Sequence, residues 1–256
     1  MIFTEKENLL ANEAHLTKAM LVSGLNSLRR ANIVLKGEYY QAFFSLSIGF
    51  ERMLKIIYIS AYRADHNGNF PTGNELKKLS HNLVKLWDYI GIKKLEGIHK
   101  DILEFLDVFA GYSRYYNLDI IMNKTGKNKE HGDVLEHWAM IQNNILKASG
   151  KERCMSRKQQ ELAKYIDNVS MTLMHNLKGE ELVSSAQVAN EEINMDIIQG
   201  YSVQYVFEII KILYYKINEI EKVDYRMPVL TEFFDYFNDY WKPYQIRNKR
   251  NWLNIR

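Results

Sequence analysis

Residues 38–63 read EYYQAFFSLSIGFERMLKIIYISAYR, and this stretch decides the fold class. Its apolar side chains recur at helical spacing, and no proline interrupts it. The spacing predicts one long helix whose broad apolar face must be covered by other elements. That face is formed by Phe43, Phe44, Ile48, Met53, Leu54, Ile57 and Tyr58.

Helical periodicity continues on both sides of this stretch. A helix is predicted before it, over residues 5–36, with Gly37 as its C-cap, and another after it, from the cap Asn74 to Ile90. A capping box of Ser156 and Gln159 predicts the start of a helix that runs to residue 177. Strand-like alternation is absent, and a short hairpin within residues 111–132 is the one strand structure that the sequence allows. The fold class is therefore predicted to be all-α, with further helices over residues 98–110, 133–148, 180–199, 201–223 and 229–241.

The length of 256 residues suits one large helical domain or two small ones. We predict a helical bundle at residues 1–150 and a second helical region at residues 151–256 that packs on it or extends it. The region ends in a basic tail from Lys242 to Arg256, in which Tyr244 and Trp252 are interleaved. Such a tail could hold a nucleic-acid backbone and stack a base, or it could dock on the protein.

Charge and cysteine content restrict the environment of the protein. The formal net charge of +3 permits contact with nucleic acid but does not argue for it. The single cysteine, Cys154, excludes an intramolecular disulfide, and a reducing cytoplasm is the expected compartment. The amino terminus does not resemble a signal peptide, and no apolar stretch is long enough to cross a bilayer, so no membrane partner is expected.

Three short segments resemble the HEPN family of helical bundles. Residues 35–44, LKGEYYQAFF, followed by Glu51 and Lys55, look like the entry into the long helix of that family. Residues 79–86, LSHNLVKL, are similar to its histidine-containing helix start, and the pair Arg114–Tyr115 falls where many members have an Arg-Tyr pair. The resemblance covers about residues 20–120. It implies a HEPN-like bundle, association with RNA or a nucleotide, and a role in a defence or toxin–antitoxin system with a protein partner encoded nearby.

Charged residues of these segments form the candidate ligand site. Glu51 and Lys55 lie one helical turn apart, and His81 is near the start of a facing helix. Arg114 could reach the same cleft from a loop and bind a phosphate, while Tyr115 could stack on a base. The alternative is a solvated helix pair with a capping histidine. The predicted ligand-binding residues are Glu51, Lys55, His81, Arg114 and Tyr115.

One departure from the family concerns catalysis. Nuclease members of the HEPN family carry an arginine, then four to six residues, then a histidine on one helix, which brings both side chains to one face. None of the seven histidines here follows an arginine at that spacing. A metal-independent ribonuclease would therefore need His81 and Arg114 from different helices as its catalytic residues. The hypotheses are an RNA- or nucleotide-binding protein, such a ribonuclease, and a structural or adaptor protein that recognises another protein through aromatic faces.

No cofactor or metal is predicted. The densest group of potential ligands is Glu130, His131, Asp133 and His137, but it has no recognised metal-binding spacing. A homodimer is predicted through the apolar faces of the helices over residues 38–63 and 201–223.

Overall fold

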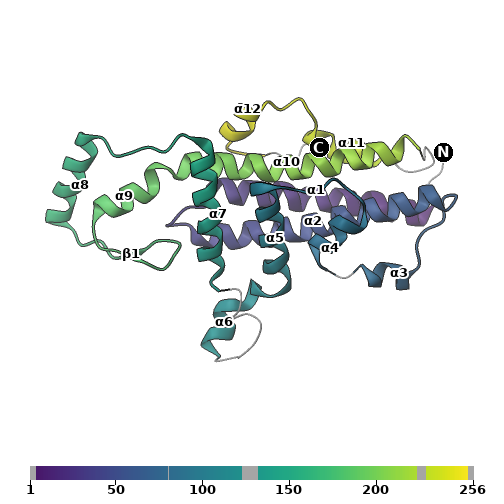
Figure 1. The fold of residues 1–256 in the computed structure, drawn as a ribbon, viewed down its shortest axis with the longest axis horizontal. Coiled ribbons are helices and arrows are strands. Elements are labelled where there is room, and N and C mark those ends of the chain that lie inside the picture. The colour runs from purple at the N-terminus through teal and green to yellow at the C-terminus, as the bar shows by residue number, and fades with distance from the viewer. Residues whose placement is uncertain (1–3, 80, 123–131, 224–228, 253–256) are drawn as a thin grey trace.

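The computed structural model describes residues 4–79, 81–122, 132–223 and 229–252. Three long helices lie side by side, and two shorter helices pack across them (Figure 1). This arrangement confirms the predicted all-α class. The long helices are α1 (Glu5–Arg30), α2 (Lys36–Asp65) and α10 (Met195–Glu221), and the crossing helices are α5 (Gly97–Gly111) and α7 (Val134–Ser149).

Helices α1 and α2 form an antiparallel pair in close contact. A Cβ atom on Gly24 of α1 would lie 2.5 Å from Cγ of Leu46, and one on Gly49 of α2 would lie 2.7 Å from Cδ2 of Leu21. Each glycine therefore lies against a leucine side chain of the other helix. Because glycine has no side chain, the two backbones can approach each other closely.

The turn between α1 and α2 differs from the prediction. Helix α1 ends at Arg30, and Gly37 lies in the first turn of α2, so its prediction as a C-cap was wrong. Ala31 is the C-cap of α1, and the Asn32 side chain orders the turn after it, because its Oδ1 accepts hydrogen bonds from the N–H groups of Val34 (2.9 Å) and Leu35 (2.8 Å).

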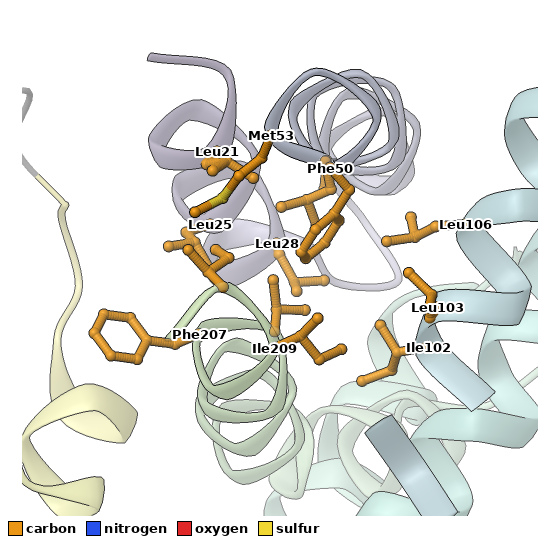
Figure 2. Close-up of a cluster of buried hydrophobic side chains, with 14 of the residues drawn as sticks. Leu21, Leu25, Leu28, Phe50, Met53, Ile102, Leu103, Leu106, Phe207 and Ile209 are labelled. Carbon is orange, nitrogen blue, oxygen red and sulfur yellow. The ribbon is translucent and has the colours of Figure 1, made fainter. Parts of the chain in front are cut away.

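One hydrophobic core spans both predicted regions. Side chains of α1, α2, α5 and α10 meet in its centre (Figure 2). Because α10 packs against α1, α2, α5 and α7, the core is continuous across the boundary that we predicted at residue 150. Fully buried members include Leu25 and Leu28 of α1, Phe50 and Met53 of α2, Ile102 of α5, and Phe207 and Ile209 of α10.

A buried polar network fixes the relative positions of α2, α7 and α10. The Tyr39 hydroxyl accepts hydrogen bonds from Nε2 of Gln142 (3.0 Å) and Nε2 of Gln199 (2.7 Å). Burial raises the pKa of the Tyr39 hydroxyl, and the hydrogen bonds from the two amides offset only part of this increase. The tyrosine is thus held neutral, and its polar tip is satisfied inside the core.

The helix predicted from Asn74 to Ile90 is two short helices, α3 (Gly73–Lys78) and α4 (Leu83–Tyr89). Thr72 rather than Asn74 caps α3, in a capping box with Glu75. Asn82 caps α4, accepting from the Lys85 N–H at 2.7 Å. The second cap starts a new helix, so His81 lies between the two helices rather than inside one.

An arm formed by residues 156–193 extends from one end of the bundle (Figure 1). The predicted capping box of Ser156 and Gln159 is present at the start of α8 (Arg157–Val169). The helix ends at residue 169 rather than 177, and a hairpin of β1 (Met174–His175) and β2 (Glu181–Leu182) follows. This hairpin forms the one sheet found in the described residues. The sequence patterns did not predict a hairpin at this position. Helix α9 (Ser185–Ile193) then leads into α10.

The chain beyond α10 folds back onto the bundle. It forms α11 (Leu230–Phe234), the 3-10 helix η3 (Asp235–Phe237) and α12 (Pro243–Asn248). The 3-10 helix η1 (Ser113–Tyr115) and α6 (Tyr116–Ile121) occupy the described part of residues 111–132. Within the described ranges, no helix combines the length and apolar composition needed to cross a bilayer.

Candidate functional site

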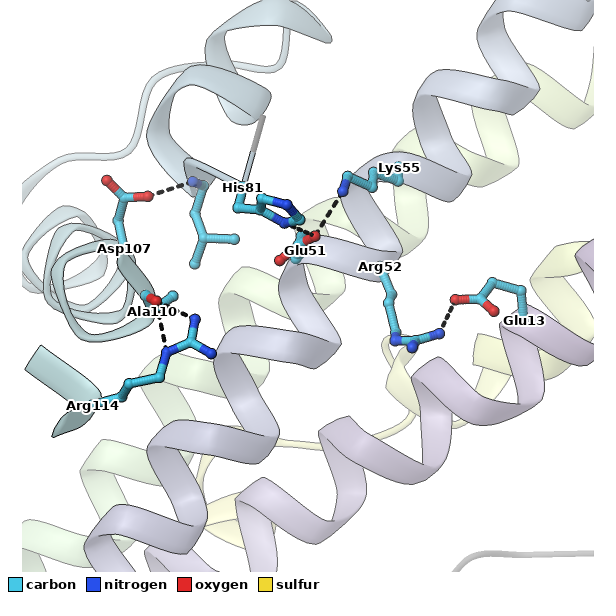
Figure 3. A network of polar contacts seen from close by, with 9 residues as sticks. Glu13, Glu51, Arg52, Lys55, His81, Asp107, Ala110 and Arg114 are labelled. Carbon is cyan, nitrogen blue, oxygen red and sulfur yellow. Dashed lines mark hydrogen bonds and ion pairs between the residues drawn. The ribbon is translucent and has the colours of Figure 1, made fainter. Parts of the chain in front are cut away.

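Glu51, Lys55 and His81 form one hydrogen-bonded cluster on the outer face of α2 (Figure 3). Oε1 of Glu51 lies 2.7 Å from Nζ of Lys55 and 2.8 Å from Nδ1 of His81. The Glu51 side chain is 21% exposed, whereas the His81 side chain is 81% exposed. The cluster therefore consists of a largely buried carboxylate that contacts a lysine ammonium group and a solvent-exposed imidazole.

Asp107 of α5 holds His81 at this position indirectly. The Asp107 carboxylate accepts a hydrogen bond from Nδ2 of Asn82 (2.6 Å) and another from the N–H of Leu83. Burial raises the pKa of the Asp107 carboxyl, and the hydrogen bonds from these donors offset only part of this increase. The contacts fix the start of α4 on α5, and His81, which directly precedes Asn82, is thereby brought against Glu51.

Glu51 is the electrostatic centre of the cluster. Burial alone would raise the pKa of this carboxyl. The hydrogen bonds from Lys55 and His81 outweigh burial, so the pKa of Glu51 lies below its usual value. Glu51 is thus an anion at neutral pH and orients the imidazole through Nδ1, which directs Nε2 away from the carboxylate.

Arg114 and Tyr115 lie in η1, at the end of α5. The Arg114 guanidinium turns back to the end of α5, where Nε donates to the Ala110 carbonyl oxygen at 3.0 Å and NH2 donates to the same atom (Figure 3). The Tyr115 side chain is exposed. The hydrogen-bonded cluster thus brings together three of the five predicted residues, Glu51, Lys55 and His81. The Arg114 guanidinium is not part of this cluster.

A pocket of about 700 Å³ lies next to this cluster, between the second half of α2 and helices α3 and α4. Lys55, Tyr58 and Tyr62 follow one face of α2 at spacings of three and four residues, so the pocket continues the cluster along the helix. Its lining includes Tyr58, Tyr62, Asp65, Glu75, Lys85 and Tyr89.

Three tyrosines form a wall of this pocket. The ring centroids of Tyr58 and Tyr62 are 6.2 Å apart, and those of Tyr58 and Tyr89 are 5.5 Å apart. The backbone N–H of Thr72 and its hydroxyl lower the pKa of Glu75, which keeps this carboxylate ionised. None of these tyrosines was predicted as a site residue, because an aromatic stripe on a helix more often marks the core. We call the cluster and this pocket together the α2–α4 groove.

Two other candidate features have structural roles in the described chain. Asp133 caps α7 by accepting from the N–H of Leu135 at 2.7 Å, and His137 packs edge-on against Phe105. Glu130 and His131 lie outside the described residues, within which no group of three potential metal ligands occurs. Trp252 of the basic tail is buried against Phe207 and Trp241, so of the two alternatives for the tail, base stacking is not available to Trp252. The described tail docks on α10 instead.

Comparison with known proteins gave no matching family model, no matching curated protein and no matching solved structure. The geometry and chemistry of the groove are therefore the basis for a function.

Proposed function

We propose that the α2–α4 groove binds single-stranded RNA or a nucleotide. The supporting observation is the meeting of Lys55 and His81 on Glu51, beside a pocket walled by tyrosines. Lys55 and Lys85 supply cations for a phosphate, and the exposed ring of Tyr89 offers a face on which a base can stack. Tyr58 is buried behind it, and the Tyr62 ring already has the His66 ring stacked on one face. Asp65 and Glu75 can accept hydrogen bonds from the amino group of a base.

The division of charge in the groove supports an orientation for this ligand. The carboxylates of Asp65 and Glu75 lie in the tyrosine pocket, where an uncharged base would be held. A phosphate would lie at the Lys55 end, where Lys55 and His81 face the single carboxylate of Glu51, since the two carboxylates of the tyrosine pocket repel an anion. Arg114 and Tyr115 are proposed to contact the RNA further along its backbone, with Arg114 using NH1 while its Nε and NH2 stay on the Ala110 carbonyl oxygen.

The direct experiment measures fluorescence anisotropy of a labelled single-stranded RNA during titration with the protein. Binding should weaken as the salt concentration rises, because phosphate contacts release counterions. Free nucleoside monophosphates should compete for the same site. Absence of binding at low salt would overturn the proposal.

A metal-independent ribonuclease is the second candidate. It is favoured by the 2.8 Å contact between Nδ1 of His81 and Glu51, because a carboxylate that orients an imidazole is a common arrangement for general acid–base chemistry. In this mechanism Nε2 of His81 would move the proton and Arg114 would stabilise the phosphate. The placement of Arg114 on Ala110 favours binding without cleavage over this candidate.

We further propose that the arm pairs with a second copy of this chain. The apolar faces of α2 and α10 that we expected to mediate dimerisation are covered within the chain, whereas Ala163 is the one buried residue of α8. Seven exposed side chains of about 100 Å² each would bury about 700 Å² per copy, close to the roughly 800 Å² per partner of stable complexes. They are Leu162, Tyr165, Ile166, Val169, Met171, Leu173 and Val183.

The biological setting is proposed from the HEPN-like resemblance of residues 20–120. It is a cytoplasmic defence or toxin–antitoxin system in which a neighbouring gene encodes a protein partner. An adaptor role, in which the arm binds that partner instead of a second copy, is the alternative. A nucleotidyltransferase, helicase or antitoxin gene beside this one would select among these settings.

A further inference from the structure

A second pocket, of about 560 Å³, lies where the end of α1 meets the start of α10 and the docked tail. Its lining includes three arginines, Arg29, Arg30 and Arg250, and two acidic residues, Glu192 and Asp196. Arg30 is already paired with Glu38 at 2.9 Å, so Arg29 and Arg250 are the cations considered for a ligand. Because this pocket and the α2–α4 groove share no lining residue, a ligand can bind here whether or not the groove binds RNA.

Asp196 joins two of these arginines. Its Oδ1 lies 2.7 Å from NH2 of Arg29 and 2.8 Å from NH1 of Arg250. Burial raises the pKa of Asp196, but the hydrogen bond and charge of Arg29 outweigh burial and lower it, so the carboxylate is ionised. The Asp196 side chain is 57% exposed, so it can rotate away from the arginines without unpacking the core.

Two buried polar atoms of this pocket are unsatisfied. Among the residues that the structure describes, Nε of Arg29 and Oε1 of Gln199 have no hydrogen-bond partner. Both residues are more than nine-tenths buried, and both line the pocket. Both atoms are closed to solvent, so a ligand reaches them only when the Asp196 side chain rotates away. An unpaired buried donor and acceptor are unfavourable, and a ligand that then supplies the missing partners would remove that penalty.

The start of α10 adds to the positive character of the pocket. The N-cap residue of this long helix, Asn194, makes no side-chain cap, because its Oδ1 accepts from the N–H of Arg153 at 2.7 Å. Met195, Asp196 and Gln199 of the first turns line the pocket. An anion here would interact with the positive end of the helix dipole.

We propose that this pocket binds a small phosphate monoester, with Asp196 as the internal anion that the phosphoryl group replaces. A phosphoryl group carries enough acceptor oxygens to engage Arg29 through both NH2 and Nε and to reach Arg250 at the same time. A hydroxyl of the organic part donates to Oε1 of Gln199. The volume is within the range of small-molecule sites.

The test uses inorganic phosphate and ribose 5-phosphate as probes, with isothermal titration calorimetry and thermal unfolding of the whole chain. Both probes should raise the midpoint of unfolding above that in chloride at equal ionic strength, since they bind the folded state. Ribose 5-phosphate should bind more tightly than phosphate. Arg250→Ala should weaken binding about tenfold, because the exposed Arg250 side chain contributes a charge-assisted contact.

Asp196→Asn distinguishes this proposal from a purely structural ion pair. Removal of the internal anion should strengthen phosphate binding several-fold, even if it destabilises the fold. Arg247→Ala is the matched control, because Arg247 lies on the same tail but contacts Gln204 (2.7 Å) and Tyr201 instead. Phosphate that stabilises no more than chloride, weaker binding by Asp196→Asn, or equal losses in the two arginine variants would each overturn the proposal.

Discussion

The Nδ1 atom of His81 lies 2.8 Å from Oε1 of Glu51, although 30 residues separate them in the chain. The same oxygen lies 2.7 Å from Nζ of Lys55. One half-buried carboxylate thus gathers two side chains that can meet a phosphate. Removing it should affect both stability and ligand binding.

The pH dependence of stability should report the Glu51 carboxylate. Its pKa is lowered in the folded state from the usual 4.5, so its stabilising contribution is present above that pH and is lost as the pH falls through the lower folded pKa. Glu51→Gln should therefore be less stable than the wild type at pH 7. The difference should shrink below about pH 4.5 in urea unfolding measured by circular dichroism. A difference that grows as the pH falls would contradict this assignment.

Gly24→Ala tests the contact between α1 and α2. The added methyl group would lie 2.5 Å from Cγ of Leu46, and such overpacking costs about 1–3 kcal/mol. This loss exceeds the roughly 1 kcal/mol gained by replacing a helical glycine. Gly37→Ala is the control, because its Cβ position faces open space, with no atom of another element within 4 Å. It should stabilise by up to about 1 kcal/mol. Chemical denaturation of both variants should give opposite signs, and equal signs would contradict the packing.

Leu162→Glu tests the pairing of the arm. The wild type should sediment as a dimer at micromolar concentration, and a charge in the centre of the apolar stripe of α8 should give a monomer. Tyr240→Glu puts the same charge at another exposed hydrophobic position, outside the arm, and should leave the dimer intact. A wild-type monomer, or a Leu162→Glu dimer, would refute the self-association.

His81→Ala separates binding from cleavage. We expect the wild type to leave labelled RNA intact in the presence of a chelator, since Arg114 is held by Ala110. His175→Ala, which alters another exposed histidine, is the control. Metal-independent cleavage that His81→Ala abolishes and His175→Ala retains would select the ribonuclease instead.

Local sequence patterns predicted some of these features and not others. The capping box of Ser156 and Gln159 was predictable, because its residues lie three apart and interact within one helical turn. The break at His81 was not, because the apolar spacing of Leu76, Leu79, Leu83 and Leu86 suits one helix, and Asp107 fixes the new start from a distant helix. The spacing of Glu51 and Lys55 was enough to predict that they share a helix face. Their contact with His81, like the burial of Trp252, depends on tertiary packing that no local pattern contains.

The affinity of Lys55→Ala for single-stranded RNA is the most direct test of the proposed groove. Loss of one charge-assisted contact should weaken binding about tenfold relative to the wild type. Lys100→Ala is the matched control, because Lys100 also forms a Lys–Glu pair one turn apart, with Glu104 at 3.6 Å, but lies on α5 outside the groove. We predict this tenfold loss for Lys55→Ala and no loss for Lys100→Ala. Equal affinities of the two variants, measured by anisotropy at one salt concentration, would contradict RNA binding in the groove.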